Sequence, residues 1–266
     1  MEIFKSSIFR LYKCQIWVGR ARIIKAFRGV PSHFKCQSFR SCASVGQSRS
    51  SKDKQNEVNH QDEPLQDPDF FQVSKLFTVR DLLNANVHLG HHEGCWNPFM
   101  KPYLYGSRER FHIIDLDKTS MHLNLALNVM SHITYRNGVI LFVSTHPQFE
   151  ELVQQTARDA GEYFITRQWN IGTFTNSNIL LDTTRLPDLV VFMNIPMFGR
   201  GAPPIKEAAQ CNIPSIGIVD SDCDPRLIMY PIPGNDDTPS AMELYCKLFK
   251  EAILNAKEYR DSLNET

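Results

Sequence analysis

The chain has 266 residues, of which 42% are hydrophobic, and its 29 basic and 29 acidic residues give a formal net charge of zero. This length predicts one domain with an appendage or two small domains, and the hydrophobic content is sufficient for a buried core. The longest purely apolar runs, at residues 139–143 and 189–193, hold five residues each. A membrane-spanning helix needs about 20 apolar residues, so the sequence predicts none.

Charge divides the chain into a basic head and an acidic body. Residues 1–52 hold eleven Lys or Arg residues and a single acid, which leaves 18 basic and 28 acidic residues in the remainder. The apolar residues of the first turns share one side of a helix: Ile3, Phe4, Ile8 and Leu11. No apolar core of about 7–15 residues, which a secretory signal requires, is present. We therefore predict a mitochondrial transit peptide at residues 1–52, removed within residues 39–51; a basic tail that binds RNA is the alternative.

The remaining organisation follows from composition. Residues 53–75 are polar, acidic and contain proline, which predicts a linker, and residues 76–262 carry the pattern of a folded domain. The seven cysteines are scattered and include no C-x-x-C pair. This pattern indicates reduced thiols in a reducing compartment, not a disulfide framework.

Strands and helices alternate through the body. Thr78 precedes a short predicted helix at 79–84, and strands are predicted at 112–115, 139–144, 163–166, 189–194 and 215–220. Helices are predicted after Asp117, with Met121, Leu125, Val129 and Ile133 facing inward, from Pro147 to Gly161, at 205–210, and from Pro239 to about 260. This order predicts an α/β fold with a doubly wound, five-stranded parallel sheet of flavodoxin-like order and helices on both faces.

The segment from residue 88 to 119 combines histidines, aromatic residues and cations. His88, His91, His92 and Cys95 have a spacing that could bind zinc, but no second pair follows, so bonds to backbone and RNA phosphate are the preferred interpretation. The run W-N-P-F-M-K-P-Y at 96–103 has two prolines, which predict an extended backbone that displays Trp96 and Lys101. Trp96 could equally pad the sheet. Lys101, Arg108 and Arg110 suit phosphate contacts.

This segment resembles the opening segment of the ribosomal protein S2 family. Further blocks at 140–145, 169–176, 187–194 and 213–237 resemble the family in the same order, so that the resemblance covers residues 78–260. It implies a flavodoxin-like fold and a structural role in a small ribosomal subunit. His88 and His91 match the family's H-x-G-H motif, and the loop at 168–176 resembles its R-W-L-G-G-x-L-T-N turn, with Gln168 in place of the Arg and Arg167 one position earlier. Bacterial relatives insert a helical hairpin after Asn176, where this chain has ten residues before Pro187.

Two further motifs allow an enzymatic interpretation. Asp220, Asp222 and Asp224 follow a predicted strand and could hold Mg²⁺ for phosphoryl chemistry, whereas in the resembling family this run caps a turn before Pro225. Asn235, Asp236 and Asp237 likewise read as a turn at a helix N-terminus. Residues 199–201, Gly-Arg-Gly, lack a complete phosphate-loop motif. The alternative function is therefore a Mg²⁺-dependent phosphate-handling enzyme, but no nucleophile or base stands at a fixed spacing.

We therefore predict a structural, non-enzymatic component of the mitochondrial small ribosomal subunit, located in the matrix. Its predicted partners are rRNA and neighbouring ribosomal proteins, with no membrane, small-molecule substrate, cofactor or assigned metal. The predicted RNA contacts are His88, His91, Trp96, Lys101, Arg108, Arg110, Lys118, Arg167 and Asn176. We expect the cations to form one local face, because an acidic body is repelled by phosphates elsewhere. Met197 and Phe198 are the predicted contacts to a protein neighbour.

Overall fold

A computed structural model describes residues 69–180, 185–195 and 202–264, all within the compact unit Glu57–Thr266. The basic head lies outside the described residues, as do Met197 and Phe198. The helices are α1 (Val79–Asn84), α2 (Leu116–Tyr135), α3 (Glu150–Ala160), α4 (Ser177–Leu180), α5 (Pro203–Gln210) and α6 (Pro239–Asn264). The strands are β1 (Leu89–His92), β2 (Leu104–Arg108), β3 (Phe111–Ile114), β4 (Ile140–Val143), β5 (Tyr163–Ile165), β6 (Leu189–Phe192), β7 (Ser215–Val219) and β8 (Tyr230–Pro233).

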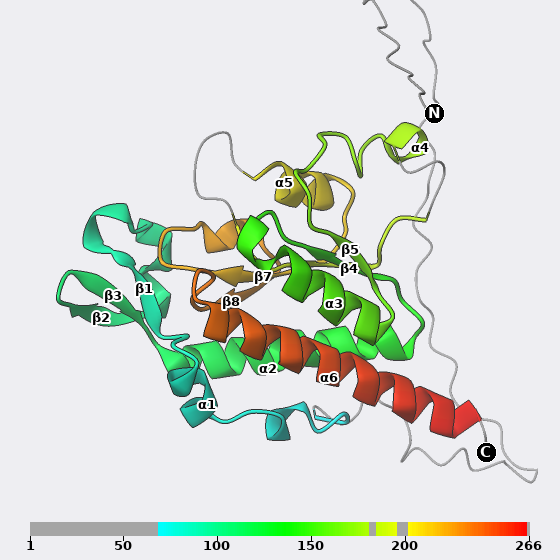
Figure 1. Ribbon diagram of the computed structural model, residues 1–266, viewed down its shortest axis with the longest axis horizontal. Coiled ribbons are helices and arrows are strands. Elements are labelled where there is room, and N and C mark those ends of the chain that lie inside the picture. Colours follow the sequence, from blue (N-terminus) through cyan, green and yellow to red (C-terminus); the bar gives the residue numbers. More distant parts are fainter. Residues whose placement is uncertain (1–68, 181–184, 196–201, 265–266) are drawn as a thin grey trace, which may run out of the picture. The chain divides into compact units, whose positions relative to one another are not determined.

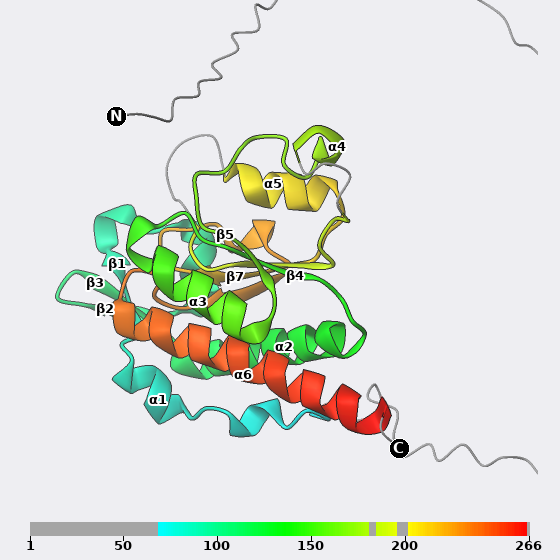
Figure 2. The ribbon, with the colours of Figure 1, turned by 45° about the vertical axis from the view of Figure 1, so that its right-hand side comes forward.

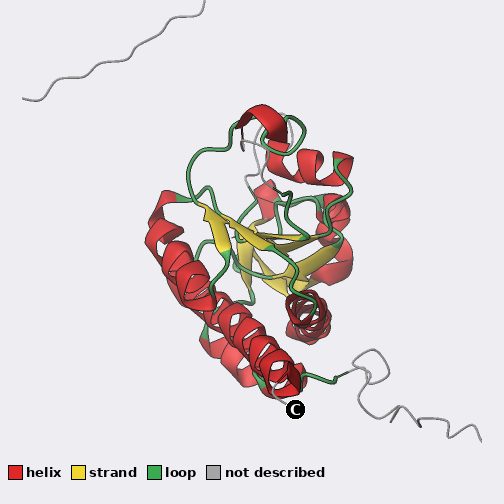
Figure 3. Cartoon of the chain, turned by 90° about the vertical axis from the view of Figure 1, so that its right-hand side faces the viewer, coloured by secondary structure: helices red, strands yellow, loops and turns green. Residues whose placement is uncertain are grey.

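The main sheet has five parallel strands in the order β5-β4-β6-β7-β8. Taken in chain order this is 2-1-3-4-5, so the predicted doubly wound, flavodoxin-like fold is confirmed. Its central strands β4, β6 and β7 are completely buried. Helices cover both faces of this sheet, as Figures 1 and 3 show.

Residues within one strand alternate between two cores. Ile140 and Phe142 of β4 pack into the core under α2, α3 and α6, whereas Leu141 and Val143 pack into the core under α5. This alternation follows from the two-residue repeat of a strand. Figure 2 shows α6 lying along α2 and α3, and α5 on the other side of the sheet. No helix within the described ranges is long and apolar enough to span a bilayer.

One predicted strand belongs to a different sheet. The prediction at 112–115 corresponds to β3, but β3 pairs antiparallel with β1 and β2 in a separate three-stranded sheet. The fifth parallel strand is β8, which the sequence analysis missed. Pro231 and Pro233 argue against a strand, yet β8 lies at the edge of the sheet and pairs only with β7, where a missing N–H is tolerated.

The inward face of α2 agrees with the prediction only in part: Ile133 packs against the core, but Met121 and Leu125 do not. Met121 is 72% exposed and Leu125 is 52% exposed, while Leu123, Leu127 and Met130 are fully buried. Both sets of apolar residues repeat at helical spacing, so periodicity alone could not select the buried set. The N-cap is Asp115 instead of Asp117; its carboxylate accepts from the amide of Asp117 (3.2 Å).

The packed chain begins before the predicted domain boundary at residue 76. Phe71 and Val73 are each 2% exposed and belong to the core under α2 and α6. Phe71 contacts the rings of His132 and Tyr259 edge-on, at centroid distances of 5.1 and 6.0 Å. Two apolar anchors in a polar segment were too weak a signal to identify from composition.

Candidate nucleic-acid interface

The small antiparallel sheet presents aromatic and basic side chains to solvent. Tyr105 is 81% exposed and Phe111 is 52% exposed, although both are large hydrophobic residues. Arg108 is exposed opposite Phe111 in the β2–β3 pair, Arg110 is exposed next to Phe111 in sequence, and Lys101 is exposed in the segment that leads into β2. Exposed aromatic rings next to cations can combine stacking with phosphate contacts, which is the chemistry that RNA recognition uses.

The turn between β2 and β3 is strained. Its two residues, Glu109 and Arg110, have φ values of 52° and 69°, in the left-handed region that glycine or asparagine normally occupies in a two-residue hairpin. A bulky residue in this conformation costs about 1–3 kcal/mol. The turn therefore places a guanidinium at the tip of the hairpin at the expense of stability.

The predicted cations differ in how they are used. Lys101, Arg108 and Arg110 form no ion pair with any described residue. Lys118, by contrast, donates to the carbonyl of Pro102 (2.6 Å) and lies 3.2 Å from the Asp115 carboxylate. Its ammonium is thus used to fasten the W-N-P segment to the start of α2.

The segment after Trp96 is helical, not extended as predicted. Pro98–Tyr103 forms a 3-10 helix that begins after Asn97, whose side chain accepts from the amide of Phe99 (3.0 Å). Proline has a φ compatible with this helix, so the asparagine cap decides the conformation. Met100 is fully buried beneath it, and the Phe99 ring lies 3.3 Å from the Arg226 guanidinium carbon.

His88 directly precedes β1, and Trp96 follows the short 3-10 helix Glu93–Cys95 after β1. Trp96 is half-buried and packs against the His112 ring at a centroid distance of 5.4 Å. This contact supports the padding interpretation of Trp96. Burial lowers the pKa of His88, whose carbonyl accepts from the amide of Ile114 (2.8 Å).

The loop that carries Arg167 and Asn176 follows β5, which is the edge strand of the parallel sheet opposite to β8. Arg167 and Asn176 are exposed, and Arg167 forms no ion pair with a described residue. The carboxyl ends of β5 and β7 share one edge of the parallel sheet, but β4 and β6 lie between them. The predicted cations therefore form two groups, one on the small sheet and one after β5.

A buried glutamate that the sequence analysis missed holds this loop. Glu207 of α5 is 5% exposed, and its Oε1 accepts from the indole N–H of Trp169 (3.3 Å) and the amide of Gly172 (2.7 Å). Its Oε2 accepts from the amide of Phe174 (3.1 Å). Gly172 has a φ of 98°, a conformation that requires glycine here. The turn is shaped by a carboxylate from a distant helix.

The H-x-G-H motif brings His91 to the carboxyl end of β7. The backbone at Gly90 passes so close to Ser221 that an added Cβ would meet its Oγ at 3.0 Å. The amide of His91 donates to the Ser221 hydroxyl (2.7 Å), and the amide of Asn97 donates to the Ser221 carbonyl (2.8 Å). Any larger residue at position 90 would require Ser221 or the His112 carbonyl, at 3.2 Å from the same Cβ, to shift by a few tenths of an ångström.

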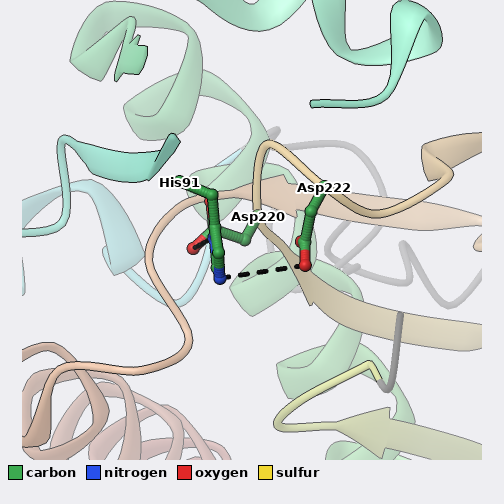
Figure 4. Close-up of side chains that lie close together, drawn as sticks. All are labelled: His91, Asp220 and Asp222. Atoms are coloured by element: carbon green, nitrogen blue, oxygen red, sulfur yellow. Dashed lines mark ion pairs between the residues drawn. The ribbon is translucent and has the colours of Figure 1, made fainter. Parts of the chain in front are cut away.

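The His91 imidazole lies among carboxylates from two loops, and Figure 4 shows three members of this group. Its Nδ1 is 3.2 Å from Oδ2 of Asp220; its Nε2 is 3.8 Å from Oδ2 of Asp222 and 3.2 Å from Oδ2 of Asp237. The contact with Asp220 is the main reason that the pKa of His91 is raised, to about 9. Burial raises the pKa of Asp222, and that of Asp236 well above its usual range.

The trio of Asp220, Asp222 and Asp224 that the alternative, enzymatic interpretation requires does not come together. The Asp224 carboxylate pairs with the Arg226 guanidinium at 2.8 Å and accepts from the Arg226 amide at 3.1 Å, so it caps the turn after Pro225. The convergent residues are His91, Asp220 and Asp222. Asn235 is a turn residue as predicted, with its Oδ1 accepting from the amides of Asp237 and Thr238.

Comparison with known proteins identifies the family. The model of the family "Ribosomal protein S2" matches residues 82–185 and 179–256. The chain belongs to the ribosomal protein S2 family. It is 49% identical over 203 residues to the small ribosomal subunit protein uS2m of Bos taurus, covering 76% of this chain and 69% of the bovine protein.

Bacterial members of the S2 family are also similar. Protein uS2 of Chelativorans sp. (strain BNC1) is 34% identical over 222 positions, which cover 68% of this chain and 83% of that protein. Protein uS2 of Rhizobium rhizogenes (strain K84 / ATCC BAA-868) is 36% identical over 219 positions, which cover 67% and 86%. Both alignments contain more positions than the residues of this chain that they cover. The bacterial proteins therefore have residues with no counterpart here, as the short connection from Asn176 to Pro187 predicts.

Proposed function

We propose that this S2-family chain is a structural component of the small subunit of the mitochondrial ribosome, where it contacts rRNA and neighbouring proteins. The observation that carries this proposal is the 49% identity to bovine uS2m. The aligned 203 residues correspond to the covered 76% of this chain, so the alignment runs with almost no gaps in it. The protein is a ribosomal component and not an enzyme.

The rRNA-contacting surface that we propose is centred on the small antiparallel sheet. Lys101, Arg108 and Arg110 are exposed and form no ion pair with a described acid, and the β2–β3 hairpin exposes the rings of Tyr105 and Phe111. Such cations release counterions when they meet phosphates, and the rings offer stacking surfaces. His88, His91, Trp96 and Lys118 position this sheet, and Arg167 and Asn176 provide a second contact after β5.

The acidic remainder favours protein neighbours over RNA. Residues after position 52 hold ten more acidic than basic residues, so phosphates are repelled wherever no local cations gather. Met121 and Leu125 expose apolar surface on α2 and are suited to contact a protein neighbour. We assign the same kind of contact to Met197 and Phe198, which lie outside the described residues. The head, residues 1–52, is the proposed mitochondrial transit peptide, followed by a linker.

Sedimentation of a mitochondrial lysate tests the proposed function. The full chain, carrying a C-terminal epitope tag, should travel with the small ribosomal subunit in a sucrose gradient. Chelation of Mg²⁺ with EDTA, which loosens the ribosome, should shift the tagged chain and the small-subunit rRNA together to lighter fractions. A chain found only at the top of the gradient, free of rRNA at normal Mg²⁺, would contradict the proposal.

A further inference from the structure

The side chain of Arg226 lies flat on the ring of Phe99. The guanidinium carbon is 3.3 Å from the ring centroid, so it lies over the face of the ring and not beside its edge. An edge-on guanidinium would push a nitrogen into the ring at this distance, and the two planes must therefore stack. Phe99 is 47% exposed, so this stacked pair lies at the surface of the protein.

Asp224 fixes the orientation of this guanidinium. Its Oδ1 accepts from Nε of Arg226 (3.0 Å) and its Oδ2 accepts from Nη2 (2.8 Å), the two-pronged geometry that holds an arginine in one plane. The Asp224 side chain also accepts from the amide of Arg226 (3.1 Å), which fixes the carboxylate on the turn. The guanidinium is thus held in position before any ligand binds.

The two segments that carry this pair are anchored to the domain. Phe99 belongs to the 3-10 helix Pro98–Tyr103, which is held by the fully buried Met100. Arg226 belongs to the 3-10 helix Pro225–Leu227, whose Pro225 is buried. The amide of Asn97 donates to the carbonyl of Ser221 (2.8 Å), which joins the two segments just before both helices.

One face of the guanidinium remains open. Phe99 covers the inner face and Asp224 occupies the edge with Nε and Nη2, yet the side chain of Arg226 is 59% exposed. The exposed part therefore includes the outer face of the plane and the Nη1 edge. We propose that an unpaired base of the small-subunit rRNA stacks on this outer face. The site rests on the proposed function and adds a contact that reads bases to the phosphate contacts of the small sheet.

The charges at this site favour a base over a phosphate. Asp224 neutralises the guanidinium and occupies the edge that would grip a phosphate with two parallel hydrogen bonds. A base needs only a parallel surface, and RNA-binding proteins stack unpaired bases on arginine planes as well as on aromatic rings. Lys101, in the same 3-10 helix as Phe99, is exposed and forms no ion pair with a described acid. A stacking surface with a cation close by in sequence suits single-stranded RNA better than a protein neighbour.

Binding of small-subunit rRNA to the tagged chain, purified from mitochondria in the form that import leaves, tests this site. Filter binding at several salt concentrations gives the affinity and its salt dependence. Arg226→Lys keeps the positive charge but loses the plane, so its affinity should fall at least about fivefold, the loss expected when one stacked base is released. The slope of log affinity against log salt concentration should not change, because no phosphate contact is lost. Phe99→Leu, which removes the ring behind the guanidinium, should weaken binding to a similar extent.

Two controls separate the outcomes, and circular dichroism verifies that every variant is folded. Arg260→Lys changes another aspartate-paired arginine, in the last turns of α6, and should bind rRNA like the wild type. Arg108→Gln removes a proposed phosphate contact and should make the salt slope shallower by about one unit. Wild-type affinity of Arg226→Lys, alongside weaker binding of Arg108→Gln, would overturn the stacking site alone. Failure of the wild-type chain to bind the rRNA would contradict the proposed function together with this site.

Discussion

Glu207 shows how one residue can determine the shape of a functional loop. Its carboxylate accepts three hydrogen bonds from the loop after β5, two of them from backbone amides. Hydrogen bonds to a charged, buried acceptor are among the strongest that a protein makes. The loop that presents Arg167 and Asn176 therefore depends on a side chain about 35 residues away in sequence.

Replacement of this acid by its amide should loosen the loop. In Glu207→Gln, the –NH₂ group would face an N–H donor, so we expect the free energy of unfolding to fall by about 2 kcal/mol. Urea denaturation followed by tryptophan fluorescence measures this, because Trp169 contacts Glu207 directly. Glu243→Gln, at an exposed position of α6, is the control and should change stability by less than about 0.5 kcal/mol. Equal stability of the two variants would contradict the assigned role.

The sequence revealed local partners of such residues but not distant ones. The cap of Asp224 on the turn at Pro225 was predictable, because donor and acceptor are two residues apart. The approach of His91 to Ser221 spans 130 residues, and no periodicity or short motif encodes it. For the same reason the sequence left open a trio of Asp220, Asp222 and Asp224, which the pairing of Asp224 with Arg226 excludes: spacing in a loop does not determine which side chains point the same way.

Strands and helices were predictable where burial is uniform and not where it depends on neighbours. β4, β6 and β7 are apolar runs that are buried on both faces, and all three were identified. β3 was found as a strand but assigned to the wrong sheet, since its antiparallel partners β1 and β2 carry few apolar residues. β8 was missed because its prolines are compatible with a strand only at an edge.

The turn of the β2–β3 hairpin is strained and carries an exposed cation, so one substitution there should stabilise the fold and weaken rRNA binding. Arg110→Gly should raise the free energy of unfolding by about 1 kcal/mol, because glycine adopts the φ of 69° without steric cost. The same change removes a proposed phosphate contact. The slope of log affinity for small-subunit rRNA against log salt concentration should become shallower by about one unit. Urea denaturation and filter binding at several salt concentrations measure the two effects.

Asn212→Gly is the matched control for this hairpin variant. Asn212 also has a positive φ, 56°, but it lies in the turn after α5 and carries no charge. We expect this variant to bind rRNA with the wild-type affinity and salt slope. If Arg110→Gly also kept both, the hairpin would not contact phosphate, and its strained turn would need another explanation.

The net charge of the full chain differs from that of the part proposed to assemble into the ribosome. The full sequence is neutral, yet residues after position 52 carry 28 acids and 18 bases. Among the described residues, the packed core begins at Phe71 and Val73. If residues 1–52 are removed, as we propose, the neutral precursor and the acidic mature protein have different electrostatic partners. Arg108 and Arg110 of the β2–β3 hairpin, which form no ion pair with a described residue, would then lie on a chain of net negative charge.

Removal of the head is thus expected of the chain that sediments with ribosomes. Peptide mass spectrometry of the protein from purified mitochondria should place the new amino terminus within residues 39–51, whereas the cell-free translation product should begin at or next to Met1. The physical reason is that eleven cations attached to the acidic body would compete for rRNA phosphates with the oriented contacts of the small sheet. Recovery of ribosome-bound chains that retain Lys5 and Arg10 would contradict this prediction and favour the alternative, a permanent basic tail that binds RNA.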